Sequence, residues 1–224
     1  MQIKTIPKDY IINMSKEAQG NFESNFLLHG LKIKNDTDQP MILKQIDMVL
    51  FANNNFVKQI TYRDQALDQI LSRFVNESTW LGKGFGAQLF LGEEGFFNPE
   101  AFSHSLTLLP NQETGIFNEY FIIVSQHRID KLSIQVLFDL DGVELRRECA
   151  VTVVDYENKN KYIFPLKGCI STCGNYNSLF DHRQHFSMEF AIDMAQYNDD
   201  QKLMFKENMQ NNDYVIWGKD VIAI

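Results

Sequence analysis

The first two thirds of the chain alternate between apolar and polar residues, as strands do when one face of their sheet is buried. The predicted strands span residues 25–34, 41–51, 56–62, 103–109, 120–126, 131–139 and 144–154. Residues typical of turns separate several of them, at 36–40, at Asn53-Asn54-Asn55 and at Asp141-Gly142, where a tight hairpin is expected. We therefore predict a mainly β region from about residue 22 to residue 156.

One segment departs from this alternation. Apolar residues recur at helical spacing between residues 64 and 78, namely Ala66, Leu67, Ile70, Leu71, Phe74 and Val75. This spacing predicts one amphipathic helix that lies over a sheet or closes one end of a sandwich. Short strands at regular intervals, together with this helix, indicate an immunoglobulin-like β-sandwich.

The pattern changes after residue 156. Residues 156–162 are polar and are typical of a linker, and an apolar stretch begins a new unit at 163–168. We therefore predict two parts, a β-sandwich accessory domain over residues 1–156 and a second region over residues 157–224.

Composition and charge narrow the classes of partner. The chain has 224 residues, of which 44% are hydrophobic and 22% charged, and a net charge of −8. This acidic balance argues against a nucleic-acid partner, and no apolar run approaches the roughly 20 residues that span a bilayer. The start of the chain lacks a signal-peptide hydrophobic region. The sequence as written therefore predicts a cytoplasmic protein, or an extracellular or cell-wall protein if a leader has been removed.

The segment richest in candidate chemistry lies near the C-terminus. His182 and His185 precede a strand-like run that ends in Asp193. Zinc sites that hydrolyse peptides use three protein ligands and a water, and imidazole and carboxylate are two of the usual ligand types. His182 and Asp193 suit two ligand positions, and His185 is the alternative to His182. The other interpretation of these residues is a solvated loop followed by a core strand.

Several motifs around this segment resemble the opening of a lysostaphin-type peptidase domain. They occur in the family's order at residues 163–168, 175–177, 182–183, 189–193 and 218–223. Members of this family are zinc metalloendopeptidases that cut the peptide cross-links of bacterial peptidoglycan. The resemblance implies a compact antiparallel β-sheet domain, a Zn²⁺ cofactor and a peptide or peptidoglycan-like substrate. It makes His182 the first zinc ligand and Asp193 the second.

Two features depart from the family pattern. His182 and Asp193 are eleven positions apart, whereas the two ligands are much closer in the compact family form. The family's His-x-His pair, which supplies the third ligand and the catalytic histidine, does not occur in these 224 residues. We therefore expect a truncated chain, a split gene product or a protein that no longer catalyses. The alternative function is a non-catalytic binding module whose sandwich supplies the surface, with a degenerate peptidase remnant.

Other chemistry-bearing residues support weaker hypotheses. A structural Cys2His2 zinc site would use Cys169, Cys173, His182 and His185, although only the spacing of the two cysteines fits. The remaining histidines, His29, His104 and His127, stand alone and are predicted to be surface or core residues. Residues 82–86 are glycine-rich and predict a flexible loop. For Phe96 and Phe97, buried packing is favoured over a sugar-binding surface.

Overall fold

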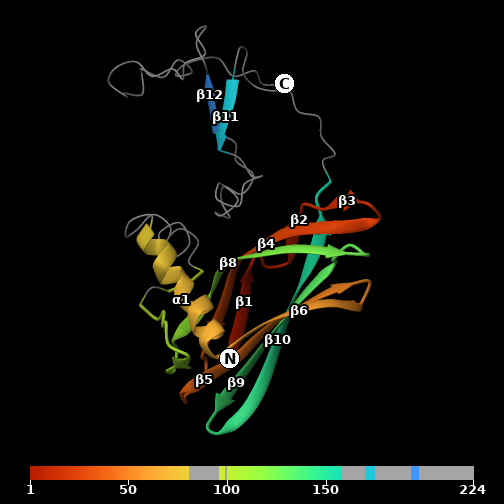
Figure 1. Ribbon diagram of the computed structural model, residues 1–224. Coiled ribbons are helices and arrows are strands. Elements are labelled where there is room, and N and C mark those ends of the chain that lie inside the picture. Colours follow the sequence, from red (N-terminus) through yellow and green to blue (C-terminus); the bar gives the residue numbers. More distant parts are fainter. Residues whose placement is uncertain (81–95, 99, 158–169, 175–192, 197–224) are drawn as a thin grey trace, which may run out of the picture. The chain divides into compact units, whose positions relative to one another are not determined.

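The computed structural model describes residues 1–80, 96–98, 100–157, 170–174 and 193–196 (Figure 1). This part of the chain is mainly β and contains one helix. The chain divides into two compact units, Met1–Tyr156 and Glu157–Ile224, which are described separately below. In the described residues, no helix has both the length and the apolar character that a membrane crossing requires.

One sheet of the first unit, called the β4 sheet here, is built on the long strand β4 (Asn21–Lys34). β8 (Glu113–Ser125) pairs along one edge of β4. On the other edge, β1 (Gln2–Ile6) and β3 (Lys16–Ala18) pair with opposite ends of β4. All of these pairings are antiparallel.

The second sheet, called the β9 sheet, has the order β2-β10-β9-β5-β6. Its strands are β2 (Tyr10–Asn13), β5 (Met41–Ala52), β6 (Asn55–Arg63), β9 (Lys131–Leu140) and β10 (Val143–Asp155). The short strand β7 (Thr107–Leu108) pairs with the start of β5. Only the pairing of β2 with β10 is parallel among these strands.

Side chains from both sheets form one hydrophobic cluster. Phe26 of β4 and Phe121 of β8 stack with their ring centroids 4.8 Å apart. The β9 sheet contributes alternate residues of its central strands, including Ile46, Met48 and Ile134. Since residues one position apart on a strand point to opposite faces, these residues define the inner face of each sheet.

The helix α1 (Asp64–Trp80) completes this cluster. Leu67, Ile70 and Leu71 are buried in it, whereas Ala66 is exposed. The helix contacts β8, β6 and β5 and runs beside β8 in Figure 1. Because β8 and β6 are edge strands of the two sheets, α1 covers the core between those edges.

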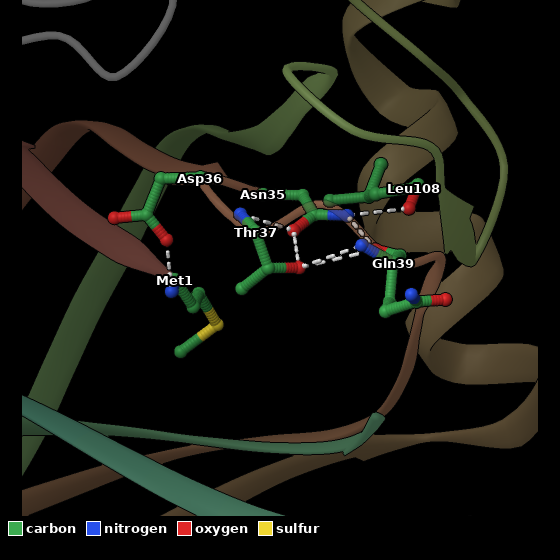
Figure 2. A network of polar contacts seen from close by, with 6 residues as sticks. All are labelled: Met1, Asn35, Asp36, Thr37, Gln39 and Leu108. Atoms are coloured by element: carbon green, nitrogen blue, oxygen red, sulfur yellow. Dashed lines mark hydrogen bonds and ion pairs between the residues drawn. The ribbon is translucent and has the colours of Figure 1, made fainter. Parts of the chain in front are cut away.

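The turn predicted over residues 36–40 is organised by Asn35, which is fully buried (Figure 2). Its Nδ2 donates hydrogen bonds to the carbonyl oxygens of Gln39 and Leu108, at 2.8 and 2.9 Å. Its Oδ1 accepts from the amide and the hydroxyl of Thr37, at 3.0 and 2.7 Å. The amino group of Met1 pairs with Asp36 beside it. One amide side chain thus joins the β4–β5 turn to β7.

Most of the predicted elements are confirmed, with boundaries shifted by a few residues. The hairpin at Asp141-Gly142 is present, and both residues have the positive φ that a tight hairpin turn requires. The strand predicted over 103–109 was wrong for the most part, since pairing is limited to β7. The strand predicted to begin at residue 120 begins at Glu113, and β1, β2 and β3 were not predicted.

In the second unit, the structure describes one strand pair. β11 (Ile170–Gly174) and β12 (Asp193–Gln196) pair antiparallel. A register shift between Thr172 and Gly174 leaves Cys173 as an additional residue on β11. This is the arrangement of a β-bulge.

Candidate functional site

Of the predicted zinc ligands, the structure describes Asp193 alone. It is the first residue of β12 and lies opposite Gly174 in the register of the pair. Cys173 precedes Gly174, so the backbone of this cysteine is next to that of Asp193. His182, His185 and the other predicted thiol, Cys169, lie outside the described residues. The structure therefore describes one residue of the predicted site. The sequence analysis predicted a strand-like run that ends in Asp193, whereas β12 begins at Asp193.

The three isolated histidines lie in the first unit. His29 is buried in β4, and His127 is exposed. The ring of His104 packs against Phe102 with the centroids 5.0 Å apart, and desolvation there lowers the pKa of His104. Within the described ranges, no group of three or more His, Cys, Asp or Glu residues is arranged to hold a metal ion.

Phe96 and Phe97 are buried, which confirms the packing prediction for both rings. They cover the outer face of the β4 sheet where Gly30 and Gly115 have no side chain to displace them. Lys32 lies beneath them, and its Nζ donates a hydrogen bond to the Phe96 carbonyl oxygen. The glycine-rich segment 82–86 lies outside the described residues.

Lys32 and Glu113 form an ion pair under this aromatic cover. The Nζ of Lys32 is 3.7 Å from Glu113 Oε2 and 5.0 Å from the centre of the Phe96 ring. Desolvation lowers the pKa of Lys32, and the negative charge of Glu113 opposes this shift. Glu113 also accepts a hydrogen bond from the amide of Asn98. The pair therefore holds the segment that contains Phe96 and Phe97 on the sheet.

The outer face of the β9 sheet has a different character. In cross-strand register, Glu148, Gln135, Asp47 and Thr61 form a line over β10, β9, β5 and β6. We call this line the polar row. The next outward position on β5 toward the start of the strand is Gln45, and the next toward its end is Val49, opposite Gln59 of β6.

Asp47 is the centre of a hydrogen-bond network on this face, although its residue is only 3% exposed. Its carboxylate accepts two hydrogen bonds from Gln45 Nε2, at 2.9 and 2.8 Å. It also accepts from Gln59 Nε2 at 2.9 Å and from Thr61 Oγ1 at 2.7 Å. Two amides and a hydroxyl are thereby held by one carboxylate.

Two further hydrogen bonds, separate from the Asp47 network, involve the other two residues of the polar row, Glu148 and Gln135. Ser133 donates to Glu148 Oε1 at 2.7 Å, and Arg146 donates to Gln135 Oε1 at 3.0 Å. The face thus presents oriented amide, carboxylate, hydroxyl and guanidinium groups over four strands. Such groups give hydrogen bonds in both directions to a polar ligand.

A second line on the same face is rich in aromatic residues. The register places Tyr10, Thr152, Lys131, Phe51 and Phe56 side by side over all five strands of the β9 sheet. We call this line the aromatic row. Tyr10 is 53% exposed and Phe56 is 62% exposed. Lys131 Nζ lies 5.2 Å from the centre of the Phe51 ring.

The sequence analysis did not find these two rows. Alternation predicted the strands that carry them, but a row joins residues of different strands, and its members follow from the pairing register. The one available signal was the run of polar residues at the outward positions of predicted strands, as at Gln45, Asp47, Gln59 and Thr61.

Comparison with known proteins adds no assignment. No model of a known protein family matches this chain, and a search of curated proteins finds no match. Its function must therefore be inferred from its own residues.

Proposed function

We propose that this chain is a zinc metallopeptidase-like protein in two parts. Residues 1–156 form an immunoglobulin-like β-sandwich accessory domain. Residues 157–224 form the N-terminal part of a lysostaphin-like domain, whose ancestral reaction is hydrolysis of peptide bonds in peptidoglycan cross-links. The observation that carries the proposal is that Asp193 belongs to an antiparallel strand pair, although the resemblance places the ligand aspartate at the end of a short strand and Asp193 is the first residue of β12.

The sheet topology supports the sandwich. β1 pairs with β4 in one sheet, and β2, which follows it closely, pairs parallel with β10 in the other. The N-terminal segment that contains β1 and β2 therefore pairs with a strand of each sheet. The central order β10-β9-β5-β6 in one sheet and β8-β4-β1 in the other supports an immunoglobulin-like sandwich, because variable-type domains have the same strand order. The helix α1 lies in the connection from β6 to β8.

The donor chemistry of the second unit supports zinc. Imidazole and carboxylate are both ordinary Zn²⁺ ligands, and His182 and Asp193 would hold the ion, with His185 in place of His182 as the alternative. A bound Zn²⁺ would polarise a peptide carbonyl and lower the pKa of a water molecule. The chain's own contribution is the backbone position of Asp193, which the pairing of β12 with β11 fixes.

Zinc content tests this proposal directly. The full chain is purified with zinc, dialysed, and its metal measured by mass spectrometry for the wild type, His182→Ala, Asp193→Ala and His185→Ala. We expect about one zinc per chain, which is lost in Asp193→Ala and in one of the two histidine variants. His127→Ala, an exposed histidine of the first unit, is the matched control and should retain the metal.

The outcomes separate the competing interpretations. If zinc persists in Asp193→Ala but is lost in Cys169→Ser and Cys173→Ser, the result would refute the peptidase-like site and support the structural Cys2His2 site. A wild-type chain that binds no zinc, or variants that all retain it, would remove the peptidase-like site.

The second candidate function, a non-catalytic binding module, is favoured by a specific observation. The outer face of the β9 sheet presents an ordered network of polar groups beside exposed aromatic rings. Such a surface on an accessory domain would serve recognition and would need no metal.

A further inference from the structure

We propose that the outer face of the β9 sheet binds a neutral, hydroxyl-rich glycan, which lies across the strands along the aromatic row and the polar row. The proposal rests on the first unit alone. It therefore stands or falls separately from the zinc site in the second unit.

The aromatic row supplies a stacking surface of suitable length. Neighbouring strands are about 4.8 Å apart, so the four intervals between Tyr10 and Phe56 span about 19 Å. That length accommodates a short oligosaccharide. Sugar rings carry apolar C–H faces, and the exposed rings of Tyr10 and Phe56 offer large apolar surfaces to them. Thr152 and Lys131 lie between these rings in the row and add polar groups.

The polar row supplies hydrogen-bond acceptors in a fixed orientation. Gln45 and Gln59 turn their NH₂ groups toward the carboxylate oxygens of Asp47, which accept their hydrogen bonds. Their Oε1 atoms are then directed away from Asp47 and can accept from the hydroxyl groups of a ligand. Asp47 acts here as a positioning residue, because the network orients the two amides before any ligand arrives.

Small side chains separate the two rows. The line between them consists of Ala150, Ser133, Val49 and Gln59 in register. Three of these four side chains are shorter than those of the flanking rows. A ligand that lies over this line can contact both rows.

The charges of this face favour a neutral glycan over other partners. The outward register positions carry three cationic residues and four acidic ones, so neither sign dominates; they are Lys131, Arg146 and Arg63, and Asp47, Asp139, Glu144 and Glu148. A polyanion would need a basic surface, and the chain carries a net charge of −8. A protein partner would favour a core depleted in charged residues, whereas the centre of this face is the Asp47 network.

Calorimetric titration of the full chain with a soluble chito-oligosaccharide tests the proposal. We expect binding, and we expect Phe56→Ala and Tyr10→Ala to raise the Kd about tenfold each, the effect typical of losing a contact worth about 1.4 kcal/mol. Val124→Ala is the matched control, since Val124 is an exposed residue of β8 on the other sheet. It should leave the Kd unchanged.

A double-mutant cycle tests the positioning role of Asp47. Asp47→Asn presents an amide to Gln59 and disturbs the orientation of its side chain, so the Kd should rise. If Asp47 acts through Gln59, Asp47→Asn should have a smaller effect in a Gln59→Ala background than in the wild type. Equal effects in both backgrounds would refute the positioning role.

The choice of probe distinguishes the sources of the ligand. Binding of the chito-oligosaccharide but not of a cello-oligosaccharide supports an acetamido sugar such as those of peptidoglycan strands. Binding of the cello-oligosaccharide as well supports a general glycan face. Failure to bind either probe, or affinities unchanged in Phe56→Ala and Tyr10→Ala, would overturn the proposal. Zinc content should be the same in all of these variants, so this test and that of the peptidase-like site fail independently.

Discussion

The outer faces of the two sheets in the first unit differ in what lies on them: aromatic rings cover one face, and polar side chains line the other. On the β4 sheet, Gly30 and Gly115 leave space on the surface, and Phe96 and Phe97 fill it. On the β9 sheet, the corresponding central positions carry Asp47 and Gln135, which accept hydrogen bonds from neighbouring side chains. Where glycines leave the centre of a sheet face without side chains, residues from another segment of the chain can pack on it. A face whose polar side chains bond to one another can remain open to a ligand.

The two faces also place their charges differently. Lys32 and Glu113 are paired beneath aromatic rings, where desolvation is large enough to lower the pKa of the lysine. Asp47, in contrast, accepts its hydrogen bonds from uncharged donors of Gln45, Gln59 and Thr61. The covered face therefore depends on close packing and ion pairing, and the open face on hydrogen bonds. Three substitutions test this contrast, in order of decreasing effect on stability.

Gly115→Ala should be the most destabilising of the three. An added Cβ would overlap the carbonyl oxygen of Leu31 and lie 2.7 Å from the Phe97 ring, and backbone cannot move aside cheaply. We expect a loss of about 3 kcal/mol or more in the free energy of unfolding, measured by denaturant titration. Gly142→Asn is the control, because the space around Gly142 is open and asparagine tolerates its positive φ. Similar losses in both variants would show that the close contacts at Gly115 are not the cause.

Lys32→Met should follow, with a loss of about 3 kcal/mol, because it leaves the buried carboxylate of Glu113 without its cation. Adding Glu113→Gln in the same chain should recover part of this loss. The matched control is Arg128→Met, which breaks the exposed pair of Arg128 with Asp155 at 2.7 Å. Exposed pairs contribute at most about 1 kcal/mol. An equal effect at the two pairs would contradict the difference in burial on which this prediction depends.

Asp47→Asn should cost the least, about 1 kcal/mol, since the open face depends on hydrogen bonds to uncharged donors. The measurement is again the free energy of unfolding, and Glu144→Gln on the exposed β10 hairpin serves as a control with no expected change. If Asp47→Asn destabilised the chain as strongly as Gly115→Ala, the Asp47 network would be required for the stability of the fold. That result would contradict the view that this face is an open surface available to a ligand.

The strands that could be predicted are those whose alternation is strong. β9 follows the rule closely, whereas β5 combines an alternating middle with a register shift between Leu43 and Gln45 and an apolar end. The Asp141-Gly142 turn marks the hairpin of β9 and β10 by local turn chemistry. β1, β2 and β3 escaped prediction because each is only three to five residues long, and their pairing with β4 and β10 stabilises them. The early part of β8 escaped because Glu113, Thr114 and Gly115 give no apolar signal, although all three are buried in the structure.

The candidate sites also differ in whether the sequence could identify them. Asp193 could be singled out from its spacing to histidines, and its ligand role stays a prediction. Asp47 could not be singled out, because a carboxylate on an alternating strand is indistinguishable from a solvated one until its cross-strand neighbours are known. Gln59 and Thr61 reach it from a strand twelve to fourteen residues away in sequence.

By itself the sequence determined the mainly β character, the helix that begins at Asp64 and the turns, because these depend on side-chain period and on local backbone preferences. Tertiary structure decided which sheet face is covered, which residues form the aromatic and polar rows, and how far β8 extends. Those outcomes depend on pairing register and on contacts such as that of Phe97 with Gly115, which join positions that no local pattern relates.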